Sequence, residues 1–330
     1  MLANSSLSFY NDLMQEPKKV DLVGVGLNAT DTLIMLPHYP ARGSKLNYRD
    51  EAHLPGGQTA SACVACQHWG LATRYIGKLG DDDAARLHHQ AFAAEGVDAK
   101  IFTVPGAYSS HSTIIVDGDG ERTVLGRKDD RLLLSADEID PAWIESARVL
   151  LVDGFETQAA IRAAKIARAA GIPVVADLDE IYDGVEELIS LVDYLIVSRD
   201  FPCRIMREPD LKLALRKLKE RFGNKLAAAT LGQDGVIAFD GNQFVYRSAF
   251  QVPVVDTTGA GDIFHAGFIY GLLQQWPLEQ QLDFACAAAA LNCTGSGARG
   301  GIRSVEQTVS LEHSTRRYPA AFAASESIEE

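Results

Sequence analysis

The alternation of strand-like and helix-like segments between residues 148 and 200 constrains the fold of this chain more than any other feature. Short runs rich in Val, Leu and Ile alternate with longer runs whose apolar residues recur at helical spacing. The expected strands cover 149–152, 173–177 and 194–197, and the expected helices cover 158–170 and 185–191. Strands connected through helices pair in parallel by right-handed crossovers. We therefore expect an α/β fold with a mostly parallel central sheet.

In a sheet of this kind, ligands bind beyond the carboxyl ends of the strands. The polar residues that follow the expected strands in this region are Asp153, Asp177, Asp179 and Ser198. They are the first candidates for a functional site.

The composition excludes several classes of protein. The 330 residues are 47% hydrophobic and 23% charged, which is typical of a globular protein with a sizeable core. The net charge of −13 argues against nucleic acid or an anionic membrane as a partner. No apolar run is long enough to span a membrane and the start of the chain is polar, so we expect a cytoplasmic protein. Five cysteines, an odd and sparse set, indicate free thiols in a reducing compartment.

Two short motifs suggest ligand sites that their surroundings do not support. Cys63 and Cys66 have the spacing of a metal-binding pair, but no second pair follows and both lie in an apolar helical run, which favours packing. Gly24 and Gly26 resemble the start of a dinucleotide-binding loop. The third glycine is missing, however, and residues 32–36 are expected to form a strand where that loop requires a helix.

The stretch from Val252 to Leu273 carries the clearest sign of chemistry. The β-branched run at 252–255 is expected to form a strand, and apolar residues at helical spacing follow the glycine turn at 259–261. The turn has no bulky side chain, and the amides of the first helical turn favour an anion such as phosphate. Asp262 would repel that anion unless it had a separate role, and accepting a proton from an incoming hydroxyl is such a role. The alternative is that Asp262 only caps the helix.

The sequence Asp-Thr-Thr-Gly-Ala-Gly-Asp at 256–262 resembles the C-terminal signature of the ribokinase-like (PfkB) carbohydrate kinases. The resemblance covers about residues 20 to 310. It implies that Asp262 is the catalytic base and that the amides of Gly259, Ala260 and Gly261 stabilise charge on the transferring phosphoryl group. It also implies a three-layer α/β/α sandwich with a small β-sheet lid, and the use of ATP and Mg²⁺.

The same resemblance implies a domain organisation. A kinase domain at 19–312 is expected between an N-terminal tail at 1–18 and a C-terminal tail at 313–330. The lid strands are expected from about 32–54 and 111–127. Lid strands often pair across a dimer in this family, so a homodimer through the lid is an option.

Five residues are candidates for binding the acceptor. The resemblance implies that Asp31 hydrogen-bonds sugar hydroxyls, and that Gly56 and Gly57 of the Pro-Gly-Gly-Gln-Thr-Ala-Ser segment bring the backbone against the sugar. The alternative for Asp31 is a solvated turn acid. Ser61 stands where the family usually has Asn. Lys45 is expected on a lid strand, where it could meet an anionic group of the acceptor; the alternative is that Lys45 is solvated and Ser61 only packs.

Other segments imply a nucleotide site. Its candidate residues are Ser198, Thr230, Gly232, Gly235 and Asn292. The segment around Gly232 and Gly235 resembles the nucleotide loop of the family, although an ordinary β-turn would suit it too. Asn292 precedes the loop where the family holds adenine. Asp256 and Thr258 are the candidates for a monovalent cation, K⁺.

The sequence contains no Walker A loop, protein-kinase set, serine-hydrolase elbow or zinc His-Glu-x-x-His motif. The segment 256–262 therefore favours transfer of the γ-phosphoryl group of ATP to a hydroxyl of a small carbohydrate. Residues 293–302, Cys-Thr-Gly-Ser-Gly-Ala-Arg-Gly-Gly-Ile, look similar to the ketohexokinase and sulfofructose kinase branches, which favours a ketose or an acidic sugar. The alternatives are a nucleoside kinase of the same fold and a non-catalytic sugar or nucleotide sensor.

Overall fold

The computed structural model describes residues 20–118, 122–314 and 316–319. The predicted tail at 1–18, residues 119–121, and the end of the predicted C-terminal tail lie outside the described residues. The centre of the fold is a nine-stranded sheet with the order β13-β12-β11-β10-β9-β8-β1-β4-β5. Its strands are β1 (Val20–Val25), β4 (Thr73–Leu79), β5 (Asp98–Thr103), β8 (Ala147–Asp153), β9 (Val174–Leu178), β10 (Tyr194–Ser198), β11 (Leu226–Thr230), β12 (Val236–Phe239) and β13 (Phe244–Arg247). Neighbours from β5 to β11 run parallel, and β12 and β13 are antiparallel. The mostly parallel sheet is confirmed.

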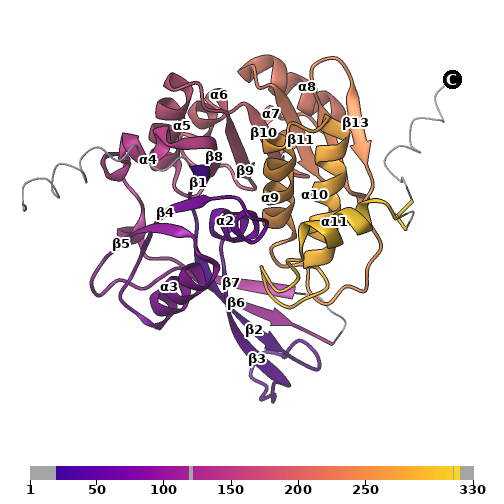
Figure 1. Ribbon diagram of the computed structural model, residues 1–330. Coiled ribbons are helices and arrows are strands. Elements are labelled where there is room, and N and C mark those ends of the chain that lie inside the picture. The colour runs from indigo at the N-terminus through magenta and orange to yellow at the C-terminus, as the bar shows by residue number, and fades with distance from the viewer. Residues whose placement is uncertain (1–19, 119–121, 315, 320–330) are drawn as a thin grey trace, which may run out of the picture.

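Helices cover both faces of this sheet and make it the middle of three layers (Figure 1). One face carries α2 (Gln58–His68), α3 (Asp83–Glu95), α9 (Ala260–Leu273), α10 (Leu278–Asn292) and α11 (Val305–Glu312). The other carries α4 (Pro141–Glu145), α5 (Thr157–Ala169), α6 (Val185–Ser190), α7 (Phe201–Met206) and α8 (Leu211–Phe222). Short 3₁₀ turns occur at η1 (Asp130–Leu132), η2 (Ala136–Glu138) and η3 (Gly232–Asp234). Successive strand residues point to opposite faces, so Leu151 of β8 joins one buried cluster and Leu150 joins the other.

A second sheet projects from one end of the sandwich and forms the expected lid (Figure 1). Its strand order is β3-β2-β6-β7, with β2 (Ala29–Met35), β3 (Asp50–Gly56), β6 (His111–Val116) and β7 (Arg122–Arg127). β2 pairs antiparallel with β3 and parallel with β6. Because β3 ends at Gly56, directly before α2, the lid joins the sandwich at the glycine pair that the sequence singled out.

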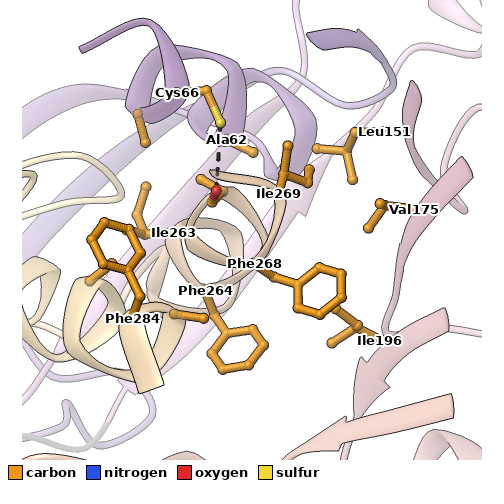
Figure 2. Packing of buried hydrophobic residues seen from close by; sticks show 14 of the residues in the cluster. Ala62, Cys66, Leu151, Val175, Ile196, Ile263, Phe264, Phe268, Ile269 and Phe284 are labelled. Atoms are coloured by element: carbon orange, nitrogen blue, oxygen red, sulfur yellow. Dashed lines mark hydrogen bonds between the residues drawn. The ribbon is translucent and has the colours of Figure 1, made fainter. Parts of the chain in front are cut away.

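The helix α9, which carries Asp262, is buried along most of its length. Figure 2 shows Phe268 pointing from α9 toward Ile196 of the central sheet, while α2 and α10 pack against other sides of the helix. Gly267 allows α10 to come close, since a Cβ there would lie 2.7 Å from the Cα of Ala285. This packing holds the start of α9 on a rigid support.

Residues 252–255 do not form the strand expected before the glycine turn. Pro253 has no amide proton to give to a ladder. Val254 and Val255 are 53% and 62% exposed. The amide of Val255 instead donates to the carbonyl of Cys293 at 2.8 Å, so the segment lies as irregular backbone against the loop that follows α10.

The sequence suggested that Lys45 lies on a lid strand, and this prediction is wrong. β2 ends at Met35 and β3 begins at Asp50, and Lys45 is exposed in the loop between them. Pro37 and the left-handed Gly43, at φ 80°, lie in this loop and favour turns over continued strand.

Candidate active site

Glycines shape the start of α9. Gly259 caps the helix with φ 74°, and a Cβ on it would lie 2.3 Å from the carbonyl oxygen of Ala298. A Cβ on Gly261 would meet nothing within 4 Å among the described residues, and Gly261 is exposed. The amides of the first turn therefore have open space beside them, which is what an anion site at a helix N-terminus requires.

Asp262 lies in this first turn, and burial raises the pKa of its carboxyl group to about 7. The carboxylate of Asp177 also raises this pKa, and that of Asp31 adds a smaller effect. The side chains of His265 and Arg299 lower it. A carboxylate that titrates near neutral pH is suited to accept a proton from a hydroxyl group.

Two more buried carboxylates lie at strand positions that the sequence analysis singled out. Asp31 lies on β2 and Asp153 ends β8, and burial raises the pKa of each to about 6. Asp153 accepts hydrogen bonds from the amide of Leu27 at 2.7 Å and the hydroxyl of Thr59 at 2.8 Å. Asp153 is also the register partner of Asp177 on β9. Asp153 and Asp177, predicted at strand ends from the alternation of strands and helices, thus lie side by side and are called here the acidic edge.

The backbone of the Gly56–Gly57 pair lies directly against Asp31. A Cβ on Gly56 would lie 2.3 Å from Oδ2 of Asp31. Gly57 has φ 92°, and a Cβ there would lie 2.4 Å from the Cα of Asn28. Both positions therefore require glycine. The structure brings together three predicted acceptor residues, Asp31, Gly56 and Gly57.

Arg299 is a site residue to which the sequence analysis gave no role. Its Nε donates to the hydroxyl of Ser61 at 3.2 Å, and its Nη2 donates to the carbonyl of Gly56 at 3.0 Å. Ser61 is completely buried, so its short side chain makes room for the guanidinium. Burial lowers the pKa of Arg299 to about 10, and its charge lowers the pKa of Asp31 and Asp262. The sequence carried two signs that could have indicated this contact: Ser61 stands where the family usually has Asn, and the segment 293–302 contains an arginine.

His265 was also missed, although it lies one turn beyond Asp262. It is buried, with Nδ1 2.8 Å from the carbonyl oxygen of Gly261 and Nε2 3.1 Å from that of Ile196. Nδ1 also lies 3.3 Å from Oδ2 of Asp177. Burial lowers the pKa of His265, and the two carbonyls partly offset this effect. Because the Gly261 carbonyl and the Asp262 amide belong to one peptide group, His265 orients the first turn of α9.

The proposed cation residues organise the loop after α10. Asp256 accepts from the amide of Thr258 at 2.9 Å and from its hydroxyl at 2.8 Å, and its other oxygen accepts from the amide of Gly297 at 2.7 Å. Asn292 is fully buried and donates to the carbonyls of Thr258 and Ala298, both at 3.1 Å. Asn292 therefore lies inside this loop, and its neighbours on α10 face the cavity described next.

A cavity of about 210 Å³ lies beside the start of α9. It brings together Thr230, Gly232, Gly235, Ala260 and Gly261 from the predicted nucleotide and anion sites. Much of the remaining lining is apolar and includes Val252, Phe264, Cys286, Ala289, Ala290 and Cys293. Gly232 has φ 63° and open space around it, so backbone is accessible there. At Gly235 a Cβ would lie 1.9 Å from the carbonyl oxygen of Arg247, which means that the hairpin itself requires this glycine.

Of the predicted nucleotide residues, Ser198 and Asn292 lie outside this cavity lining. Ser198 pairs with Thr230 in the sheet, but its hydroxyl donates to the carbonyl of Asp179 at 3.4 Å. Lys45 stays in the exposed loop between β2 and β3.

In the described ranges, no helix is long and apolar enough to cross a membrane. The same residues contain no group of three His, Cys, Asp or Glu side chains arranged to hold a metal ion.

Comparison with known proteins identifies the family. The model of the pfkB family carbohydrate kinases matches residues 30–304, which include the Gly56–Gly57 pair, the acidic edge and the start of α9. The chain belongs to the pfkB family of carbohydrate kinases. It is therefore a phosphotransferase whose acceptor group is an alcohol.

Individual relatives agree with this assignment. A ribokinase from Haemophilus influenzae is 27% identical over 302 residues, covering 88% of this chain and 98% of its own length. A fructokinase from Klebsiella pneumoniae is 30% identical over 270 residues, covering 74% of this chain and 87% of its own. The structure of Arabidopsis thaliana ribokinase complexed with ribose and ATP has a TM-score of 0.77 at 24% identity, covering 90% of this chain and 99% of that one. This last likeness confirms the ribokinase-like fold.

Proposed function

We propose that this protein transfers the γ-phosphoryl group of ATP to a hydroxyl of a small carbohydrate, with Asp262 as the base. One observation carries the proposal. Asp262 lies at the helix turn whose Gly261 lines the 210 Å³ cavity, and its carboxyl group is electrostatically coupled to Asp31 of the acceptor side. A base in that position could act between the two substrates of a phosphoryl transfer.

The acceptor would lie against the Gly56–Gly57 backbone, with its hydroxyls donating to Asp31. Asp262, once ionised, takes the proton of the attacking hydroxyl. The first-turn amides of α9 stabilise the charge on the phosphoryl oxygens, with Gly261 leaving room for them. His265 keeps those amides in place through the Gly261 carbonyl. Each step uses a group already held by packing, so little reorganisation is needed.

The nucleotide would occupy the cavity beside α9, with phosphates toward Gly232 and Gly261. Hard oxygen ligands that fit Mg²⁺ stand at neighbouring strand ends, in Asp179 and Ser198, and would hold the ion through water. Mg²⁺ entering with ATP would neutralise phosphate charge. K⁺ at Asp256 and Thr258 is a further proposal, supported by the Asp256 carboxylate and by the carbonyl oxygens of Thr258 and Ala298, which Asn292 links.

The acceptor class follows from the charge around Asp31. Ionised carboxylates such as those of the buried Asp31, Asp153 and Asp177 accept hydrogen bonds from hydroxyl groups and repel anions. A polyhydroxyl portion, as in a ketose, therefore suits the inner site. An anionic group of an acidic sugar would have to point outward, toward the loop that carries Lys45.

The lid supports the proposed homodimer. β7 is an edge strand of the lid and exposes Val124 and Leu125 by 54% and 55%. Pairing two such strands would cover these side chains and satisfy free backbone groups. Light scattering across a concentration series tests this, and a monomer at every concentration would contradict it.

A coupled ADP-release assay tests the activity. Purified enzyme with ATP and Mg²⁺ is offered ketoses, aldoses, acidic sugars and nucleosides, and the Asp262→Asn variant serves as the control for contaminating kinases. We expect turnover with at least one sugar that depends on Asp262. Turnover restricted to nucleosides would support the alternative kinase, and ATP binding with no turnover on any acceptor would support the sensor.

A further inference from the structure

The chain after α11 returns to the nucleotide cavity. Residues 316–318, called here the C-terminal wall, run antiparallel to residues 249–251 (Figure 1). The amide of Gln251 donates to the carbonyl of Arg316, and the amide of Tyr318 donates to that of Ala249, both at 2.9 Å. This part of the predicted C-terminal tail is therefore docked on the domain.

Arg317 anchors the C-terminal wall through three contacts. Its Nη2 lies 2.7 Å from Asp283 of α10, and its Nη1 donates to the carbonyl of Ser248 at 2.8 Å. The guanidinium lies 3.8 Å from the centre of the Phe250 ring. All of these groups are partly or fully buried, which strengthens charge-assisted and cation–π contacts. The position of the neighbouring Tyr318 is thereby fixed.

Tyr318 faces the cavity that runs to Gly261. It lines this space, and the residue as a whole is half-buried. Phe250, which also lines the cavity, is 1% exposed and is covered by Arg317. Tyr318 is thus an aromatic surface that a bound molecule can cover.

We propose that Tyr318 packs against the base of the nucleotide, so that the C-terminal wall forms part of the nucleotide site. The inference rests on the proposed function, because the phosphates must lie at the Gly261 end. The base then occupies the rest of the cavity, whose lining is mostly apolar. A purine has two flat apolar faces, and stacking against a tyrosine ring suits it. Because every base has such a face, Tyr318 contributes affinity without selecting between purines.

The dissociation constant for Mg·ATP, measured by titration calorimetry without an acceptor, tests this inference. Tyr318→Ala should raise it about tenfold, and Tyr318→Phe, which keeps the ring, should leave it within about twofold. Arg317→Met should raise it as well, because the wall loses its anchor. Mg·GTP binding should weaken by the same factor in Tyr318→Ala. Tyr39→Ala, a change at a tyrosine 53% exposed in the lid loop, is the matched control and should have no effect.

Each other result has a defined meaning. If the parent binds Mg·ATP and a folded Tyr318→Ala variant binds it equally well, the inference is overturned while the proposed function stands. If the parent does not bind Mg·ATP, the proposed function fails and the inference fails with it. Should Tyr318→Ala not fold, Tyr318→Leu replaces it, since leucine keeps apolar volume but removes the ring; unchanged affinity there is equally contradictory.

Discussion

The pH dependence of kcat/KM is predicted from the environment of Asp262, the proposed base. Burial raises the pKa of Asp262 to about 7, and only its ionised form can accept a proton from the acceptor hydroxyl. About half of the enzyme is then active at pH 7, about one tenth at pH 6 and about nine tenths at pH 8. Asp31, whose pKa is raised to about 6, must also be ionised to accept hydrogen bonds from the acceptor, so it should halve the activity again at pH 6 and steepen the decline below that pH.

The assay is ADP release at saturating Mg·ATP and limiting acceptor, because kcat/KM then reports groups of the enzyme before the acceptor binds. Ionic strength is held constant, and added ADP verifies the coupling enzymes at each pH. The expected profile rises about twentyfold from pH 6 to the plateau above pH 8, about tenfold from Asp262 and about twofold from Asp31. A flat profile between pH 6 and pH 8 would show that Asp262 does not titrate there and would refute the reasoning.

Three variants test other parts of the site. Gly261→Val should lower kcat about 100-fold in a folded protein, because its side chain enters open space at the anion site; unchanged turnover would remove the phosphate cradle from the account. In the parent, the charge of Arg299 lowers the pKa of Asp262 and Asp31. Arg299→Met removes this charge and should move the acid limb of the pH profile to higher pH, while Arg299→Lys, which keeps a charge, should move it less. An unmoved limb in Arg299→Met would contradict this. Lys45→Met should raise KM for an acidic acceptor and leave KM for ATP unchanged, and equal acceptor kinetics would reject the charge-pairing hypothesis.

The helix α9 and the parallel sheet could be predicted because their signals are local. The glycine turn and Asp262 are contiguous in sequence, and the helix that follows has a continuous apolar pattern. The strands β8, β9 and β10 are short and apolar because both of their faces are covered. Asp153 and Asp177 then had to converge, since the carboxyl ends of parallel strands share one edge.

Contacts between distant segments could not be predicted in the same way. Ser61 and Arg299 are 238 residues apart. Nothing in either segment alone shows that the guanidinium of Arg299 meets Ser61, at the position where the family usually has an asparagine. The docking of Arg317 on Asp283 is equally non-local. The expected strand at 252–255 failed because β-branched residues alone do not supply a neighbouring edge, and Pro253 removes a donor.

The most direct test of the account is the turnover of Asp262→Asn beside the parent. Asparagine keeps the shape of the side chain but cannot accept the proton, so kcat should fall about 100-fold or more while the dissociation constant for Mg·ATP is unchanged. The Asp262→Asn variant should stay folded at pH 8. Because the pKa of Asp262 is higher in the folded than in the unfolded state, ionised Asp262 destabilises the folded protein as the pH rises from the unfolded pKa through the folded pKa, and asparagine removes this cost. Asp83→Asn, a change at an exposed residue on α3, is the control and should match the parent. Turnover by Asp262→Asn within about threefold of the parent would contradict the central claim.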